Sequence, residues 1–388
     1  MDINKEALKL HEKLNGKIEV TSKVKINSKE QLSLLYTPGV AEPCLAIAKN
    51  KNEVYKYTIK KNSVAIVSDG SAVLGLGNIG AEASIPVMEG KAMLFKEFAG
   101  IDAFPICLKS QNVKDTINTI KNISPVFGGI NLEDIKAPEC FEIENALQNI
   151  GIPVMHDDQH GLAIVALAAL INATKVAKKD LKKCKIVFSG AGAAAIGLFR
   201  LMIKYGIDSG NIILCDREGS IYLGRKDIKG SYKEEISKLS NSKKINGSLS
   251  DALKDSDIFI GLSSKNLVSK EMVKSMADKS IILAMANPIP EIMPDEAIKA
   301  GAFIVGTGRS DFPNQVNNLL VFPGIFRGAL DCRADKITDN MKLSASLAIA
   351  NMVKNPDRNL ILPSVFDKDV VRNVSEAIKK QWMKDTHS

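Results

Sequence analysis

Three short apolar runs, each ending in polar or turn residues, mark the first part of the chain. They read SVAIVSDG (63–70), IDAFPICL (101–108) and IPVMHDD (152–158). Continuous apolar runs of this length are typical of parallel strands that are buried on both faces. Between them, residues 85–100 and 132–149 show the helical spacing of apolar positions. The alternation predicts an α/β domain built on a parallel sheet.

A long apolar segment, residues 160–177, follows and predicts a buried helix. Its most apolar part, 161–174, is too short to span a bilayer, so we expect no membrane association. The charged stretch KKDLKKCK (178–185) then resembles a linker. We therefore predict an N-terminal domain over residues 1–160 and a second domain, which includes C-terminal helices, over residues 161–388.

The second domain opens with a strand, a glycine turn and an Ala-rich helix, in the order of a dinucleotide-binding βαβ unit. The turn reads Gly190-x-Gly192-x-x-Ala195, and the next strand ends in Asp216. Such glycines let the backbone approach a pyrophosphate, which the helix N-terminus attracts. Asp216 is placed to accept hydrogen bonds from the adenosine ribose. The cofactor-binding candidates of the turn are Gly190, Gly192, Ala193, Ala194 and Ala195.

Further strand-like runs continue this second domain at residues 257–263, 280–288 and 302–308, and helical segments separate them. Right-handed crossovers between such strands produce a doubly wound sheet. We therefore expect a Rossmann-like parallel sheet in the C-terminal domain.

Two pairs of adjacent acidic residues follow strand-like runs in the N-terminal domain. Glu133 and Asp134 come after FGGIN, and Asp157 and Asp158 come after IPVMH. Acids at the ends of two strands would converge in one pocket, where carboxylates repel one another unless a hard divalent cation neutralises them. This pattern predicts a Mg²⁺ or Mn²⁺ site. The simpler alternative is that these acids are helix N-caps or solvated loop charges.

Two further residues are candidates for acid–base chemistry. Lys91 lies in MEGKAMLFKEFAG, an otherwise apolar helical segment. Burial and a nearby metal would depress its pKa and make a neutral amine available as a base; alternatively, the lysine extends along apolar surface into solvent. Tyr36 lies just before the Pro-Gly turn of LLYTPGVAEPC, which would fix its phenol in a loop, although an ordinary tyrosine usually serves packing.

Composition is that of a globular protein, with 45% hydrophobic and 25% charged residues among 388. The net charge of +8 comes from lysines spread along the chain, and aromatic residues amount to 5%, which favours a solvated surface over a nucleic-acid-binding one. Six cysteines without CxxC spacing favour free thiols in a reducing cytoplasm. Residues 1–199 contain no arginine. Any carboxylate substrate in this half must therefore be held by lysine, by amides, by a metal or by residues of the other half.

Several of these segments together resemble the malic enzymes, in their short, bacterial-type subfamily. The resemblance covers nearly the whole chain in family order and is carried by LLYTPGVAEPC, SDGSAVLGLGNIG, PVMEGKAMLFKEFAGIDAFPI, INLEDIKAPECFEIE, PVMHDDQHG, FSGAGAAAIG, ANPIPEI and GRSDFPNQVNN…FPGIFRGALD. It implies oxidative decarboxylation of (S)-malate to pyruvate and CO₂ with reduction of NAD or NADP. It also implies a decarboxylating activity on oxaloacetate and a homodimer or higher homo-oligomer.

The resemblance also implies a role for each matched residue. Lys91 takes the hydroxyl proton, Tyr36 protonates the enolate of pyruvate, and Asp157 is a carboxylate beside them that tunes Lys91 or the water around the metal. Glu133, Asp134 and Asp158 are the implied metal ligands. The implied binding residues are Asn287 and Asn318 for the substrate carboxylate, with Asn287 near the nicotinamide, and Gly77 and Asn78 in the glycine-rich segment 73–80 over the nicotinamide end of the cleft.

This chain departs from family patterns at two positions. Ala72 stands where the large-subunit enzymes carry arginine, which leaves Asn287, Asn318 and the metal to hold the β-carboxylate. Leu162 stands where threonine is usual after DDQHG, so a hydrogen bond at the helix start could be lost.

The choice between NAD and NADP depends on the charged residues near the adenosine ribose. Asp216 favours NAD because an acid repels a 2′-phosphate, whereas Arg217 or Arg225 could pair with that phosphate.

His156 and His160 flank the second acidic pair, but a hard cation prefers oxygen, so we expect them to be structural or to lie behind the ligands.

Two other functions remain open at this stage. One is a malolactic-type or oxaloacetate-decarboxylating lyase with the same site and no net redox output. The other is a dinucleotide-sensing or nucleic-acid-binding module, which the intact carboxylates and lysine disfavour.

Overall fold

The N-terminal half is built on a four-stranded parallel sheet. The computed structural model describes residues 3–73 and 75–387. The strand order is β2-β1-β3-β4, and all three pairings are parallel. The strands are β1 (Ser63–Ser68), β2 (Asp102–Cys107), β3 (Gly129–Leu132) and β4 (Val154–His156). The apolar runs predicted as strands therefore do form them.

Alternate residues of β1 pack against helices on opposite faces of this sheet. Val64 and Ile66 belong to the same core cluster as α5 and α8, whereas Ala65 and Val67 pack with α6 and α7. Successive side chains of a strand point to opposite faces, so a continuous apolar run is needed here. The helices are α5 (Gly80–Ala99), α6 (Val113–Ile123), α7 (Glu139–Leu147) and α8 (Asp157–Ala177).

One predicted helix in this half is shorter than expected. Residues 132–149 were expected to be helical, but only α7 forms within them. The preceding segment is a loop in which Asp134 adopts a positive φ of 53° and Pro138 precedes the helix. A left-handed residue ends helical hydrogen bonding. The acids Glu133 and Asp134 therefore lie on a loop at the end of β3.

The C-terminal half contains a six-stranded sheet of order β10-β9-β8-β5-β6-β7. Its pairings are parallel except for β7, which is antiparallel to β6. The predicted Rossmann-like architecture is thus confirmed, with a short antiparallel edge strand added. The strands are β5 (Ile186–Ser189), β6 (Ile212–Asp216), β7 (Gly219–Ser220), β8 (Ile258–Gly261), β9 (Ile281–Ala284) and β10 (Ile304–Thr307).

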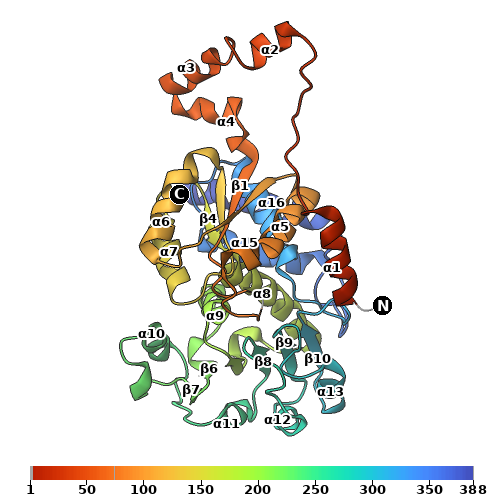
Figure 1. Ribbon diagram of the computed structural model, residues 1–388. Coiled ribbons are helices and arrows are strands. Elements are labelled where there is room, and N and C mark those ends of the chain that lie inside the picture. Colours follow the sequence, from red (N-terminus) through yellow and green to blue (C-terminus); the bar gives the residue numbers. More distant parts are fainter. Residues whose placement is uncertain (1–2, 74, 388) are drawn as a thin grey trace.

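Five helices accompany this second sheet in the lower part of Figure 1. They are α9 (Ala193–Tyr205), α10 (Tyr232–Leu239), α11 (Leu249–Leu253), α12 (Lys270–Lys274) and α13 (Pro294–Lys299). α9 follows β5 directly and packs extensively on α8. The two halves of the molecule therefore meet along the pair α8–α9.

The C-terminal helices return to the first sheet rather than staying beside the second. They are α14 (Phe322–Asp331), α15 (Asp339–Met352) and α16 (Asp369–His387). Phe322 and Phe326 of α14 stack edge-on against Phe95 of α5, with centroids 4.8 and 5.4 Å apart. α15 packs against α8 and α16, and α16 also packs against α14. The domain boundary at residue 160 stays a prediction; this residue lies inside α8.

α8 is the central helix of the fold. It begins at Asp157, three residues before the predicted start, so the adjacent acids form its first turn, where the helix dipole stabilises negative charge. Among the described residues it is also the one helix long and apolar enough to cross a membrane, although the segment was expected to be too short. Most of it is buried within the protein and packs against α9 and α15. It is a core helix, as predicted.

Three of the N-terminal helices, α2, α3 and α4, form an arm that stands clear of both sheets. α1 (Ile3–Leu14) precedes an extended segment that leads to α2 (Lys29–Leu35), α3 (Ala41–Lys49) and α4 (Val54–Tyr57). In Figure 1 α2, α3 and α4 project from the top of the molecule. None of these three helices, all of which the structure describes, contains a buried residue.

Candidate active site

Lys91 lies at the centre of the site and is 7% exposed, so it does not extend into solvent. Its ammonium donates hydrogen bonds to Glu133 Oε1 and Asp157 Oδ2, and it lies 4.6 Å from the ring centroid of Phe322. Burial lowers the pKa of Lys91, but Asp157, Glu133 and Asp158 outweigh burial and raise it. The protein's own groups therefore do not lower the pKa of Lys91 as expected, because the prediction left out the carboxylates of Glu133 and Asp157 that contact it.

Three acids beside Lys91 form a cluster that suits a divalent cation. One carboxylate oxygen from each of Glu133, Asp134 and Asp158 lies within 4.8 Å of the others. Burial raises the pKa of Glu133 well above its ordinary value; the Lys91 ammonium opposes this rise, and the neighbouring carboxylates add to it. Oxygen donors that repel one another in a buried place match the ligand preference of Mg²⁺ or Mn²⁺. These residues therefore fit the expected metal.

Asp157 connects the acid cluster to the C-terminal half. It is fully buried at the start of α8, and its Oδ2 also accepts a hydrogen bond from Asn318 Nδ2 at 2.5 Å. Asn318 opens the short helix η7 (Asn318–Leu320). A Cβ at Gly161 would lie 2.0 Å from Asp157 Oδ1, so the glycine of DDQHG leaves the room that this carboxylate needs. The structure thus places Asn318 beside Asp157.

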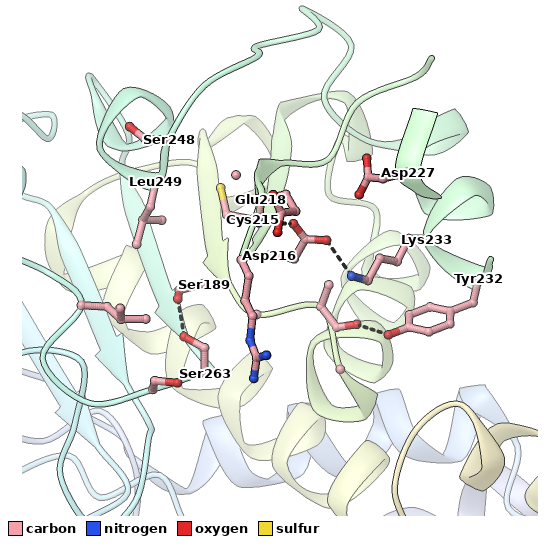
Figure 2. Close-up of a pocket in the computed structure, with 17 residues that line it drawn as sticks. Ser189, Cys215, Asp216, Glu218, Asp227, Tyr232, Lys233, Ser248, Leu249 and Ser263 are labelled. Atoms are coloured by element: carbon pink, nitrogen blue, oxygen red, sulfur yellow. Dashed lines mark hydrogen bonds and ion pairs between the residues drawn. The ribbon is translucent and has the colours of Figure 1, made fainter. Parts of the chain in front are cut away.

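A cleft of about 1130 Å³ lies at the carboxyl ends of β5 and β6, the usual ligand position in a doubly wound sheet. Figure 2 shows Ser189, Asp216 and Lys233 around it. Gly190 adopts φ +111°, and a Cβ there would lie 2.5 Å from Leu262 O, so only glycine fits. Gly192 caps α9 with open space around it. Ala193, Ala194 and Ala195 form the next turn, in which Ala195 is buried in the core.

Asp216 lines this cleft and binds two cations. Arg225 donates from Nη1 to Oδ1 at 2.9 Å and from Nη2 to Oδ2 at 2.6 Å, and Lys233 Nζ donates to Oδ2 at 2.6 Å. Burial alone would raise the pKa of Asp216, but Arg225 and Lys233 bring it to about 2. Arg225 also pairs with Asp227. Among the described residues, the cations that line the cleft are Arg217 and Lys233.

The glycine-rich loop after β1 meets the end of β9. A Cβ at Gly75, whose φ is +76°, would lie 2.7 Å from the carbonyl oxygen of Asn287. The side chain of Asn287 lies against Gly308, where a Cβ would be 2.9 Å from Nδ2. Gly77 is exposed, and Asn78 exchanges two hydrogen bonds with Gln111 at 3.0 and 2.9 Å. Loops of both halves therefore face each other here.

Tyr36 stands apart from all of these residues. It caps the C-terminus of α2 and is 66% exposed. Figure 1 shows α2 far from α5, the helix that carries Lys91. Within one chain, the structure brings Lys91, Asp157 and the acid cluster together but does not bring Tyr36 to them.

His156 and His160 lie behind the acid cluster and both contact Glu144. The backbone N–H of His156 donates to Glu144 Oε1 at 2.9 Å, and His160 Nε2 lies 3.0 Å from Oε2. Burial alone would raise the pKa of Glu144, but His160 and Lys342 bring it to about 2. His156 Nε2 lies 3.4 Å from Asp158 Oδ2. This supporting position agrees with the expectation from the sequence.

Sequence families match both halves of the chain. The malic enzyme N-terminal domain matches residues 15–148, and the malic enzyme NAD binding domain matches residues 159–386. The chain belongs to the malic enzyme family.

Relatives and solved structures extend the malic enzyme match over nearly the whole chain. The bifunctional malic/malolactic enzyme of Bacillus subtilis (strain 168) is 53% identical over 99% of this chain and 94% of its own length. The NAD-dependent malic enzyme of Geobacillus stearothermophilus is 51% identical over 94% and 76%. The crystal structure of the NAD-dependent malic enzyme from Thermotoga maritima superposes with a TM-score of 0.93, at 48% identity, covering 96% of this chain and 98% of that one. Other matched relatives are named NADP-dependent, and the chain spans about half of their length.

Two residues of this malic enzyme site were missed by reasoning from sequence. Lys233 belongs to α10, and nothing in the βαβ motif predicts that a lysine of a later helix contacts Asp216. Glu144 lies in the middle of α7, where it resembles an ordinary helical acid. The apolar neighbours Ile143 and Leu147, which are core residues, were the sequence signal that could have identified Glu144 as buried.

The two family departures have clear places in the structure. The backbone N–H of Ala72 donates to the carbonyl oxygen of Asp134 at 2.9 Å, so this position borders the acid cluster. Leu162 lies in the second turn of α8 and packs against the core. Because α8 begins at Asp157, Leu162 lies beyond the helix start, where the lost hydrogen bond was expected.

Proposed function

We propose that this malic enzyme catalyses the metal-dependent oxidative decarboxylation of (S)-malate to pyruvate and CO₂ with reduction of NAD or NADP. The observation that carries the proposal is Lys91, which is buried between Glu133 and Asp157 beside three metal-spaced acids. A buried base next to a cation site and a dinucleotide cleft is what oxidation of a 2-hydroxy acid requires.

Glu133, Asp134 and Asp158 would hold Mg²⁺ or Mn²⁺. When bound, the cation polarises the C2 hydroxyl, stabilises negative charge on its oxygen and offsets the carboxylate charge that raises the Lys91 pKa. The amides of Asn287 and Asn318 would bind the substrate carboxylate, and Asn318 is already held by Asp157. Residues Gly190, Gly192, Ala193, Ala194 and Ala195, with Gly77 and Asn78 at the nicotinamide end, would bind the dinucleotide.

The proposed chemistry divides into two steps. In the first, the C2 hydrogen of malate leaves as hydride to the nicotinamide while neutral Lys91 accepts the hydroxyl proton, which gives oxaloacetate. In the second, the bond to the β-carboxylate breaks, CO₂ leaves, and the electron pair forms the enolate of pyruvate. Tyr36 donates a proton to C3 of this enolate. The same second step would act on added oxaloacetate.

We further propose that Tyr36 acts in the active site of a second copy of the chain. Its own helix carries Leu32, Leu34 and Leu35, which are 46%, 69% and 48% exposed. Clustered exposed apolar side chains on a projecting arm are typical of a protein interface. A homodimer in which each arm covers its partner would bury these leucines and complete both sites.

NAD is the cofactor that we favour. Asp216 remains ionised, since its pKa is about 2, and it lines the cleft where the adenosine ribose would bind. However, Arg225 and Lys233 neutralise much of its charge, and Arg217 lies nearby. We therefore expect activity with NADP as well, at a lower efficiency.

We place the reaction in the cytoplasm. All six cysteines lie in the described part of the chain and are free thiols, which is typical of a reducing compartment. Malate, pyruvate and the dinucleotide are small diffusible molecules, and the proposed reaction needs neither a membrane nor a nucleic acid.

Paired kinetics test the proposed function. With malate and Mn²⁺ or Mg²⁺, NADH and pyruvate should accumulate in equal amounts, and kcat/KM for NAD should exceed that for NADP roughly tenfold because of the Asp216 charge. Absorbance at the nicotinamide band and enzymatic assay of pyruvate measure both products. Lactate in place of pyruvate, without NADH, would instead support the malolactic activity that the Bacillus subtilis relative is named for. No turnover with either metal would refute the proposal.

Mixed dimers test the position of Tyr36. Tyr36→Phe and Lys91→Ala are each expected to inactivate the enzyme. When the two variants are denatured and refolded together, about half of the dimers contain one chain of each variant, and one of the two sites in such a dimer is intact. Activity should therefore return to about a quarter of the wild-type value. The measurement is malate-dependent NADH formation before and after mixing. Mixing Lys91→Ala with Asp158→Ala is the control, since both residues lie in the same chain's cluster and share no interface. If the first mixture stays inactive while its dimers form, Tyr36 acts within its own chain.

A further inference from the structure

A second cavity lies beside α8 and is separate from the dinucleotide cleft. It has a volume of about 440 Å³, and among the described residues it shares none of its lining with the cleft. Its walls come from α7, α8, α9 and the segment that leads into α15. The residues that matter below are Glu144, Gln159, His160, Arg200, Lys336 and Lys342.

Two cations at this cavity are exposed and have no anionic partner within residues 3–73 and 75–387. Arg200 lies on α9 and Lys336 lies in the loop before α15, and both residues are exposed to solvent. A guanidinium and an ammonium at one cavity offer the donors that phosphates and carboxylates prefer.

The remaining charged groups of the cavity are already matched. Lys342 pairs with Asp339 at 3.0 Å, and Glu144 accepts from the ring of His160 at 3.0 Å. The two unmatched charges are therefore both positive. Gln159 is 2% exposed, and its Oε1 is also without a hydrogen-bond donor within the described residues, but this atom is enclosed by the protein and does not face the cavity.

We propose that this cavity binds a small organic dianion, with phosphate or two carboxylates that pair with Arg200 and Lys336. A volume of about 440 Å³ lies in the range of small-molecule sites and exceeds the size of a bare inorganic ion. A dianion can pair with both cations at once, whereas a monoanion can pair with only one.

The cavity is also connected to the acid cluster. Lys342 Nζ lies 3.4 Å from His160 Nε2, His160 contacts Glu144, and Glu144 accepts from the backbone of His156. His156 in turn lies 3.4 Å from Asp158. An anion that draws Lys342 toward itself would alter this chain of contacts. The dianion is therefore a regulator of malate use, a part of the inference that rests on the proposed function.

Direct binding tests the site. The full-length protein is saturated with NAD, so that the pyrophosphate subsite is filled, and is kept in EDTA, so that dicarboxylates cannot bind through a metal. Glycerol 3-phosphate and glutarate are then titrated separately by calorimetry, to compare a phosphate with two carboxylates. At least one should bind to a single site, and Arg200→Gln and Lys336→Gln should each weaken it roughly tenfold or more, since a charged hydrogen bond is lost.

Matched variants control for total charge. Arg372→Gln and Lys121→Gln remove the same charges at exposed positions of α16 and α6 outside the cavity, and they should bind as the wild type does. The site is refuted if neither ligand binds, or if all four variants bind alike.

Kinetics then test the connection to the acid cluster. The ligand that binds should change the KM for malate in the wild type and leave it unchanged in Arg200→Gln. If the ligand binds but the KM does not respond, the regulatory part is refuted while the site stands. Because the binding assay contains no malate, failure of the proposed function would not affect it.

Discussion

Replacing Lys91 with alanine is expected to lower the turnover of malate by roughly 10³- to 10⁴-fold, the range for loss of a general base. The side chain is buried, and its ammonium contacts Glu133 and Asp157. Within the described chain no second lysine contacts Glu133 or Asp157, so no other amine is placed to accept the hydroxyl proton. Steady-state NADH formation at saturating malate measures the loss.

A second measurement separates catalysis from folding. Removing Lys91 leaves buried carboxylates without their cation, which costs stability, so thermal unfolding and NAD binding must be measured alongside the rate. Lys96→Ala is the matched control, because Lys96 lies on the same helix with a 60% exposed side chain. Near-normal malate oxidation by a folded Lys91→Ala enzyme would overturn the assignment of the base.

Replacing Asp158 with alanine is expected to abolish metal-dependent turnover while NAD affinity stays close to that of the wild type. Asp158 contributes one of three clustered oxygens, and loss of one ligand from such a set removes most of the affinity for a divalent cation. The dinucleotide cleft shares no lining residue with this cluster within the described chain. Mn²⁺ binding by electron paramagnetic resonance and NAD binding by calorimetry measure the two effects separately.

Asp278→Ala is the control for Asp158→Ala. Asp278 is an exposed acid between α12 and β9, so its removal should affect neither Mn²⁺ nor NAD. Equal loss of both ligands in Asp158→Ala would show that Asp158 supports the fold rather than the metal.

Local sequence patterns were sufficient for most of the fold. The apolar run 63–70 contains β1, and the Gly190 turn lies between β5 and α9, because strand burial and tight turns depend on neighbouring residues. Boundaries were less certain where a loop competes with helical spacing, as in residues 132–149. The assignment of the C-terminal helices to the second domain stays a prediction, and Phe322 of α14 packs on Phe95 of α5 in the N-terminal half. Periodicity cannot reveal which surface an apolar face will cover.

The sequence by itself determined which residue types converge at the site: adjacent acids after strands, a lysine in an apolar helix and a glycine turn before a helix. The tertiary structure alone decided how these groups affect one another. It showed that carboxylates raise the pKa of Lys91, that Arg225 and Lys233 neutralise Asp216, and that Tyr36 stands away from its own chain's cluster. Each of these results depends on distances between side chains remote in sequence, and electrostatic energies follow distance and burial rather than sequence order.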